Sequence, residues 1–239
     1  MNETNMNRLP VPTWNQCGVN TAPKAAALPE LSGDWGDANF AVTLPAGVGE
    51  SEEEFTSFTE SGMGAEADAF LLENAAVRHA LTVAENVTEP AVFEFTLDAA
   101  HPGTMSVLDV DAKANSSLTL VQVLRGDAEN GAAANLVRIR AAEGAHVRLV
   151  QIQMLGSRAR RWDAVAVEEG TGAKVEQVRV ELGGSVSACG TRAVLDHAKA
   201  EYDLDAVYFG SRNAVLDYND VSVHTAKDTL CEMHTAGGL

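Results

Sequence analysis

The segment Gly144–Leu155, GAHVRLVQIQML, consists of a small-residue break followed by an alternating strand. Asn115–Leu124, NSSLTLVQVL, has the same form and shares the tripeptide Leu-Val-Gln with it. Three later segments repeat the pattern: Gly172–Leu182, Lys199–Phe209 and Ala226–Ala236. The equivalent positions of the five segments are Leu118, Val147, Val175, Tyr202 and Thr229, which lie 29, 28, 27 and 27 residues apart. A near-constant advance of this kind indicates an internal structural repeat.

A second alternating strand precedes each of these segments. The five strands are Ser106–Val110, Asn135–Arg140, Asp163–Val167, Thr191–Leu195 and Asp217–Val223. A unit of two strands cannot bury its apolar side chains alone, whereas a stack of such units can. The repeat therefore predicts an all-β core built as a β-solenoid, with parallel pairing between coils. A sandwich of seven or more strands is the structural alternative, but it does not require a constant advance.

The first part of the chain has a different composition. Five of the seven prolines precede residue 65, and proline interrupts regular structure because it lacks a backbone donor. We therefore predict loops and short helices over residues 1–65 and the β-solenoid over residues 66–239. Glu52–Phe58 is a candidate short helix. Ala65–His79 is helix-prone, or its second half already begins a strand.

The composition limits the classes of function. The formal net charge is −17 at pH 7, which argues against a broad basic surface for nucleic acid or anionic membranes. The acidity suits a solvated surface, or one that attracts metal cations or a basic partner. Because no signal peptide and no apolar run of 18 residues is found, we expect a cytoplasmic protein without a membrane span. The three cysteines, Cys17, Cys189 and Cys231, form no disulfide framework and indicate a reducing compartment.

Three segments around the repeat resemble one protein family. Arg8–Asn20, RLPVPTWNQCGVN, resembles the N-terminal signature of shorter SufD-like proteins. Ala67–Val87 looks like the segment in which a short helix leads into the first strand of the family's core. Tyr218–Leu239 is similar to the pattern in which a histidine precedes a turn, a strand of polar alternation and a small-residue bend. With the repeat between them, these segments make the chain resemble the SufB/SufD family of the SUF system.

The resemblance implies a right-handed parallel β-helix and a scaffold role in iron–sulfur cluster assembly, without catalysis by this chain. It implies a complex with a SufC-like ABC ATPase and with a SufB/SufD paralogue or a second copy, and we expect a dimer. It also implies that no cofactor is bound stably by this chain alone, and that an iron–sulfur cluster is held in the complex. The family's SufC-contacting helices and C-terminal motif follow the β-helix. Since the sequence stops at Leu239, we expect that segment to be missing, and no residue is assigned to its roles.

The densest group of metal-ligand side chains is His224, Cys231 and His234. Thiolate and imidazole are ligands that iron and zinc favour. On a strand, however, Cys231 and His234 differ by three positions and point to opposite faces. The alternative is structural, with Cys231 as a small core residue and His224 hydrogen-bonded at a turn.

Two further groups are candidates for contacts or chemistry. Cys189 lies in the small-residue stretch Gly183–Thr191, GGSVSACGT, where an exposed thiol could carry sulfur or accept a persulfide. The alternative is a buried, inert cysteine. The only basic cluster, Arg158, Arg160 and Arg161, is read as an exposed corner loop or as a contact for an acidic partner surface.

Two other functions remain open at the level of sequence. A β-solenoid can serve only for protein–protein contacts. It can also be a carbohydrate-active enzyme, but such an enzyme needs carboxylates or basic residues clustered on one sheet face and is usually exported. The aligned coil positions do not repeat Asp or Glu on one face, and no export signal is found. No phosphate-binding loop of the G-x-x-x-x-G-K-[ST] type is present, so we expect no ATP site of that kind.

Overall fold

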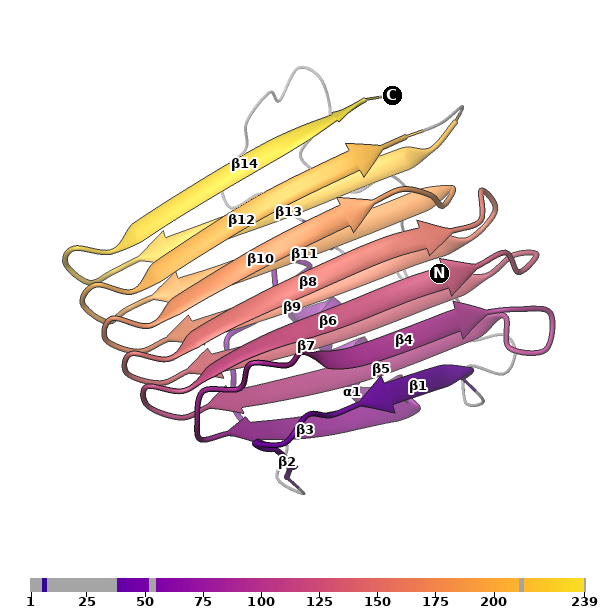
Figure 1. Ribbon diagram of the computed structural model, residues 1–239. Helices are drawn as coiled ribbons and strands as arrows, with labels where there is room; N and C mark the ends of the chain where they lie inside the picture. Colours follow the sequence, from indigo (N-terminus) through magenta and orange to yellow (C-terminus); the bar gives the residue numbers. More distant parts are fainter. Residues whose placement is uncertain (1–5, 8–37, 52–54, 211–212, 239) are drawn as a thin grey trace, which may run out of the picture.

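The computed structural model describes residues 6–7, 38–51, 55–210 and 213–238 (Figure 1). Over these residues the chain forms two-strand coils that stack into a flattened solenoid, from β3–β4 to β13–β14. The predicted all-β solenoid is therefore confirmed. The N-terminal signature Arg8–Asn20, with Cys17, lies outside the described residues.

Two seven-stranded sheets, which we call sheets A and B, run along the stack. Sheet A contains, in spatial order, β1 (Phe40–Thr43), β4 (Ala91–Leu97), β6 (Ser117–Gly126), β8 (His146–Leu155), β10 (Lys174–Glu181), β12 (Glu201–Phe209) and β14 (Leu230–Gly238). Sheet B contains β2 (Val48–Glu50), β3 (Val77–Val83), β5 (Gly103–Ala112), β7 (Ala132–Ala141), β9 (Arg160–Glu169), β11 (Val186–Leu195) and β13 (Val215–His224). Successive coils pair in parallel, whereas β1 and β2 add antiparallel strands beside the first coil.

The coil is right-handed. In Figure 1 the long strands of sheet A lie in front and run from left to right, and the strands of sheet B return behind them. Each circuit climbs one strand along the stack. This is the hand that right-twisted strands favour when a connection leads to the next parallel strand.

The register confirms the repeat in its first four coils and corrects it in the last. Leu118, Val147, Val175 and Tyr202 lie in one row across sheet A, as predicted. Tyr202 then pairs with Cys231 and not with Thr229, so the predicted last position is wrong by two residues. A shift of two residues leaves every side chain on the same face of a strand, and for this reason the alternation alone did not reveal it.

One turn recurs before each strand of sheet A from β6 onward. Two residues before each strand the backbone takes the left-handed conformation, with φ between 57° and 66°. These residues are Asn115, Gly144, Gly172, Lys199 and Asp228. Glycine, asparagine and aspartate adopt this conformation most readily. In the last coil this residue is Asp228, so the last segment begins two residues later than the predicted start at Ala226. For this reason Cys231, and not Thr229, pairs with Tyr202.

The described residues form two apolar clusters. One fills the space between the sheets and includes Phe93, Phe95 and Val165. The other lies on the outer face of sheet B, where α1 (Ala65–Asn74) packs against β5 and β7. Because both of its faces are covered, sheet B is buried almost throughout β5, β7 and β9. The helix expected within Ala65–His79 is confirmed over Ala65–Asn74, and the last three residues of that segment, from Val77, begin β3.

The segment Phe55–Glu60, which we call the strap, crosses the outer face of sheet B without forming a helix. The prediction of a short helix over Glu52–Phe58 is therefore wrong for its described part. The backbone N–H of Phe55 donates to Asp109 Oδ2 at 2.9 Å, and its carbonyl accepts from Arg138 at 3.0 Å. These bonds to sheet B take the place of the bonds that a helix would make within itself.

Candidate functional site

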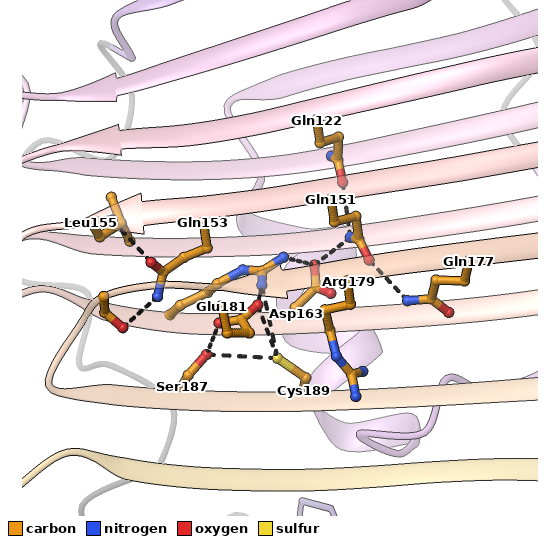
Figure 2. Close-up of polar contacts among 12 residues, drawn as sticks. Gln122, Gln151, Gln153, Leu155, Asp163, Gln177, Arg179, Glu181, Ser187 and Cys189 are labelled. Carbon is orange, nitrogen blue, oxygen red and sulfur yellow. Dashed lines mark hydrogen bonds and ion pairs between the residues drawn. The ribbon is translucent and has the colours of Figure 1, made fainter. Parts of the chain in front are cut away.

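From β6 onward, polar and charged side chains interrupt the apolar interior of the solenoid (Figure 2). They come from both sheets and point toward one another across the interior. We call this set the polar core: Gln122, Gln151, Arg161, Asp163, Gln177, Arg179, Glu181, Ser187, Cys189 and Thr191, each at most 2% exposed. Apolar residues of similar volume would usually stabilise a core as well or better. The polar core is therefore a candidate functional site.

A ladder of amides runs along the axis of the stack. Gln151 Nε2 donates to Gln122 Oε1 at 3.0 Å, and Gln177 Nε2 donates to Gln151 Oε1 at 2.9 Å. Gln177 Oε1 in turn accepts from the hydroxyl of Tyr202 at 2.6 Å and from that of Thr191 at 3.2 Å. The ladder links three successive coils, and its members hold one another in fixed rotamers because few alternative partners exist in a buried site.

A cluster of charges adjoins the ladder. Arg161 forms an ion pair with Glu181, and its guanidinium lies 3.0 Å from Asp163 Oδ1. Asp163 Oδ1 also accepts from Gln151 at 2.9 Å, which ties the charges to the ladder. Arg179 makes a bidentate pair with Asp220, at 3.0 and 2.7 Å. The buried guanidinium groups thus have carboxylate partners, as buried charges must.

Cys189 lies among these charges, on β11. Its Sγ is 3.7 Å from Ser187 Oγ and 3.9 Å from both Arg161 and Glu181. Burial raises the pKa of the thiol, and the positive charges of Arg161 and Arg179 oppose that rise only in part. The resting group is therefore a protonated thiol within reach of a carboxylate.

The setting of Cys189 differs from the one expected from sequence. The stretch Gly183–Thr191 is not a flexible exposed segment, because β11 begins at Val186 and Cys189 is fully buried. The small side chains of this stretch allow β11 to pack closely against its surroundings on both faces. Its role as a sulfur-accepting thiol stays a prediction.

A model of the family described as "SUF system FeS cluster assembly, SufBD core domain" matches residues 95–238. The chain belongs to this SufBD family. The matched region runs from β4 to β14 and contains every residue of the polar core. No curated protein and no solved structure gives a significant match to the chain.

The candidate metal ligands of this SufBD chain are not brought together. Cys231 lies in the inward-facing row of Tyr202, whereas His234 is exposed on the other face of β14. His224 lies at the end of β13, with Nδ1 2.7 Å from Thr229 Oγ1 and Nε2 3.0 Å from Ser222 Oγ. Among the described residues, no three His, Cys, Asp or Glu side chains are arranged to hold a metal ion.

The basic cluster is divided between a turn, which holds Arg158, and the start of β9, which holds Arg160 and Arg161. Arg158 is exposed and pairs with Glu129 at 3.0 Å, and Arg160 lies over the ring of Trp162 at 5.4 Å. Arg161 points inward and is fully buried, so reading all three arginines as an exposed corner loop is wrong. Residues on a strand alternate between faces, so adjacent arginines cannot share one.

Two kinds of functional residue were missed from the sequence. The charges of the polar core, Arg161, Arg179 and Glu181, alternate along β9 and β10 with outward-facing residues, and no motif surrounds them. The shared Leu-Val-Gln of β6 and β8 was the available signal for the ladder, because Gln122 and Gln151 occupy the same row.

In the described part of the chain, no helix is long and apolar enough to cross a membrane.

Proposed function

We propose that this SufBD chain is a non-catalytic scaffold subunit of iron–sulfur cluster assembly in the cytoplasm. It works in a complex with a SufC-type ABC ATPase and a second SufB/SufD chain, either a paralogue or another copy. The observation that carries the proposal is the family match over residues 95–238, which spans the stack and its polar core. The likeness of Arg8–Asn20 to shorter SufD-like proteins favours a SufD-like over a SufB-like role.

The form of the molecule suits such a role. A stack in which each coil contacts only its neighbours is rigid along its axis and holds bound partners at a fixed separation. The chain binds no cofactor stably when alone, and a cluster forms only in the complex.

Co-purification tests the proposal. The tagged full chain is co-expressed with a SufC-type ATPase and a SufB/SufD chain, and then purified without oxygen. We expect a stoichiometric complex that contains iron and acid-labile sulfide, and a tagged chain without iron when it is expressed alone. A chain that retains neither partner would contradict the proposal.

We further propose that Cys189 accepts sulfur within that role. The specific observation is the set of polar groups around its thiol, where Glu181 and Ser187 lie within 3.9 Å of the sulfur. Glu181 takes the thiol proton, and the thiolate attacks the outer sulfur of a donor persulfide. The donor S–S bond breaks, a new S–S bond forms at Cys189, and the donor leaves as a thiol after it regains a proton. No oxidant is needed, and Arg161 and Arg179 stabilise the anionic product.

A mass measurement on the full chain tests this role. After treatment with a small persulfide donor, we expect Cys189 to gain one sulfur atom in the wild type. Replacing its thiol, Cys189→Ser, removes that product, whereas the matched change Cys231→Ser leaves it. Labelling of Cys231 alone would rule out Cys189 as the acceptor.

A further inference from the structure

Part of the outer face of sheet A is apolar, and that part has no cover among the described residues. In Figure 1, α1 lies behind sheet B, and no described helix lies over sheet A in front. Outward side chains of four strands form a surface that we call the apolar stripe: Val121, Val123, Val150, Ile152, Met154, Val178, Val180, Leu182, Val207 and Phe209. Val123, Ile152, Val180 and Val207 occupy one row across the sheet.

The exposure of the stripe is large for a soluble protein. Phe209 is 63% exposed, Leu182 49% and Val207 48%. Single exposed apolar residues need no explanation, but a continuous apolar surface on a soluble protein marks an interaction site. The other sheet of this protein shows what covers such a face, because α1 packs on the outside of sheet B.

An acidic groove borders the stripe. Arg148, Glu176, Asp203 and Glu232 form one row across sheet A, and Asp205 and His234 lie in the next row. Together they line a groove of about 370 Å³. Arg148 pairs with Glu176 at 2.9 Å and Lys174 pairs with Asp203 at 2.7 Å, while Asp205 and Glu232 add negative charge without a lysine or arginine partner among the described ion pairs. The groove therefore attracts cations.

We propose that a basic amphipathic helix of a partner protein docks across sheet A. Its apolar face lies on the stripe, and its Lys or Arg side chains enter the acidic groove. Strands lie about 4.8 Å apart and a helix rises about 1.5 Å per residue, so about ten residues span β6 to β12. That length matches α1, which has 10 residues and covers the opposite sheet.

Charge decides between this occupant and others. If a second copy of the chain docked on this face, two molecules that each have a net charge of −17 would repel each other. An anionic membrane would be repelled in the same way. A basic segment gains from both the acidic row and the apolar stripe. This proposal concerns the outer face of sheet A, whereas the Cys189 thiol faces the interior, and it does not rest on the proposed sulfur role.

The test uses the full chain and a fluorescent synthetic helix built from leucine and lysine in amphipathic spacing. Binding is followed by fluorescence anisotropy at low and high salt. The groove variant Asp205→Lys/Glu232→Lys and the stripe variant Val207→Asp should each raise Kd by at least about tenfold, which corresponds to about 1.4 kcal/mol. The control Glu89→Lys/Glu143→Lys makes the same change in net charge at exposed turns and should shift Kd by less than about twofold.

Three results would overturn the proposal. The first is failure of the peptide to bind the unmodified chain. The second is a loss of affinity in the control as large as that in the groove variant, which would indicate a non-specific attraction. Self-association in sedimentation that Val207→Asp abolishes would assign the stripe to a second copy. Thermal melting of each variant verifies that it remains folded, and Val207→Thr provides a milder stripe variant if Val207→Asp does not fold.

Discussion

The backbones of Gly62 and Gly190 lie in direct contact on the outer face of sheet B. A Cβ on Gly190 would come within 2.3 Å of the Met63 nitrogen, and one on Gly62 would come within 2.3 Å of the Thr191 nitrogen. Asn219 Nδ2 also donates to the Gly62 carbonyl at 2.7 Å. The backbone at Gly62 and Met63, just after the strap, is thus packed directly on β11 beside Cys189, and only glycine permits this approach.

Gly190→Ala should lower the free energy of unfolding by about 3 kcal/mol, because backbone atoms cannot move aside as a flexible side chain can. Urea denaturation measures the change. Gly49→Ala is the matched control, since its Cβ would meet only Thr82 O at 3.8 Å, and it should cost less than about 1 kcal/mol. Equal stability of the two variants would show that the contact is looser than described.

Glu169 should make the protein less stable as the pH rises. Burial raises the pKa of this carboxyl from 4.5 to about 9, and its side chain is 1% exposed. Between these values the native state keeps a proton that the unfolded state has released, so stability falls across this window. Melting temperatures from pH 5 to pH 9 should therefore decline less steeply in Glu169→Gln than in the wild type. Parallel curves would contradict the shift.

The buried pair of Arg138 and Asp109 should matter far more than an exposed pair. Both of its hydrogen bonds measure 2.6 Å, and the side chains are 6% and 2% exposed. Arg138→Ala leaves a buried carboxylate without its partner and should cost about 3–5 kcal/mol in urea denaturation. The exposed pair Arg158–Glu129 is the control, and Arg158→Ala should cost no more than about 1 kcal/mol.

The charges of the polar core should serve function and not stability. Replacing Arg161, Asp163 and Glu181 together, by Met, Asn and Leu, removes the buried charges that pair with one another and leaves neither carboxylate without its cation. The free energy of unfolding should stay equal or rise. Sulfur transfer to Cys189 should fall, because the proton acceptor and one stabilising cation are lost. A variant that unfolds easily, or that labels as fast as the wild type, would contradict this division.

The repeat was visible in the sequence because parallel stacking demands a nearly constant advance per coil. The row of Leu118, Val147, Val175 and Tyr202 followed from spacing alone. The last step failed at Thr229, since a shift of two residues preserves alternation and only the left-handed turn at Asp228 separates the two registers.

The polar core was not predictable in the same way. Arg161 stands beside Arg158 and Arg160 in the sequence. Whether its side chain faces the interior depends on which alternate residues of β9 point inward, and the sequence did not reveal this. Its pairing with Glu181 joins opposite sheets, and alternation within one strand says nothing about a partner on the other. The strap was missed because its bonds run to side chains of sheet B and not within the segment itself.

Cluster formation in the reconstituted complex tests the central claim most directly. The chain, a SufC-type ATPase and a second SufB/SufD chain are mixed without oxygen and given iron, a sulfur donor and ATP, and the visible absorption of an iron–sulfur cluster is followed. We predict that the absorption develops only when this chain is present, and that the cluster passes to an apoprotein. Equal cluster formation in its absence would contradict the account.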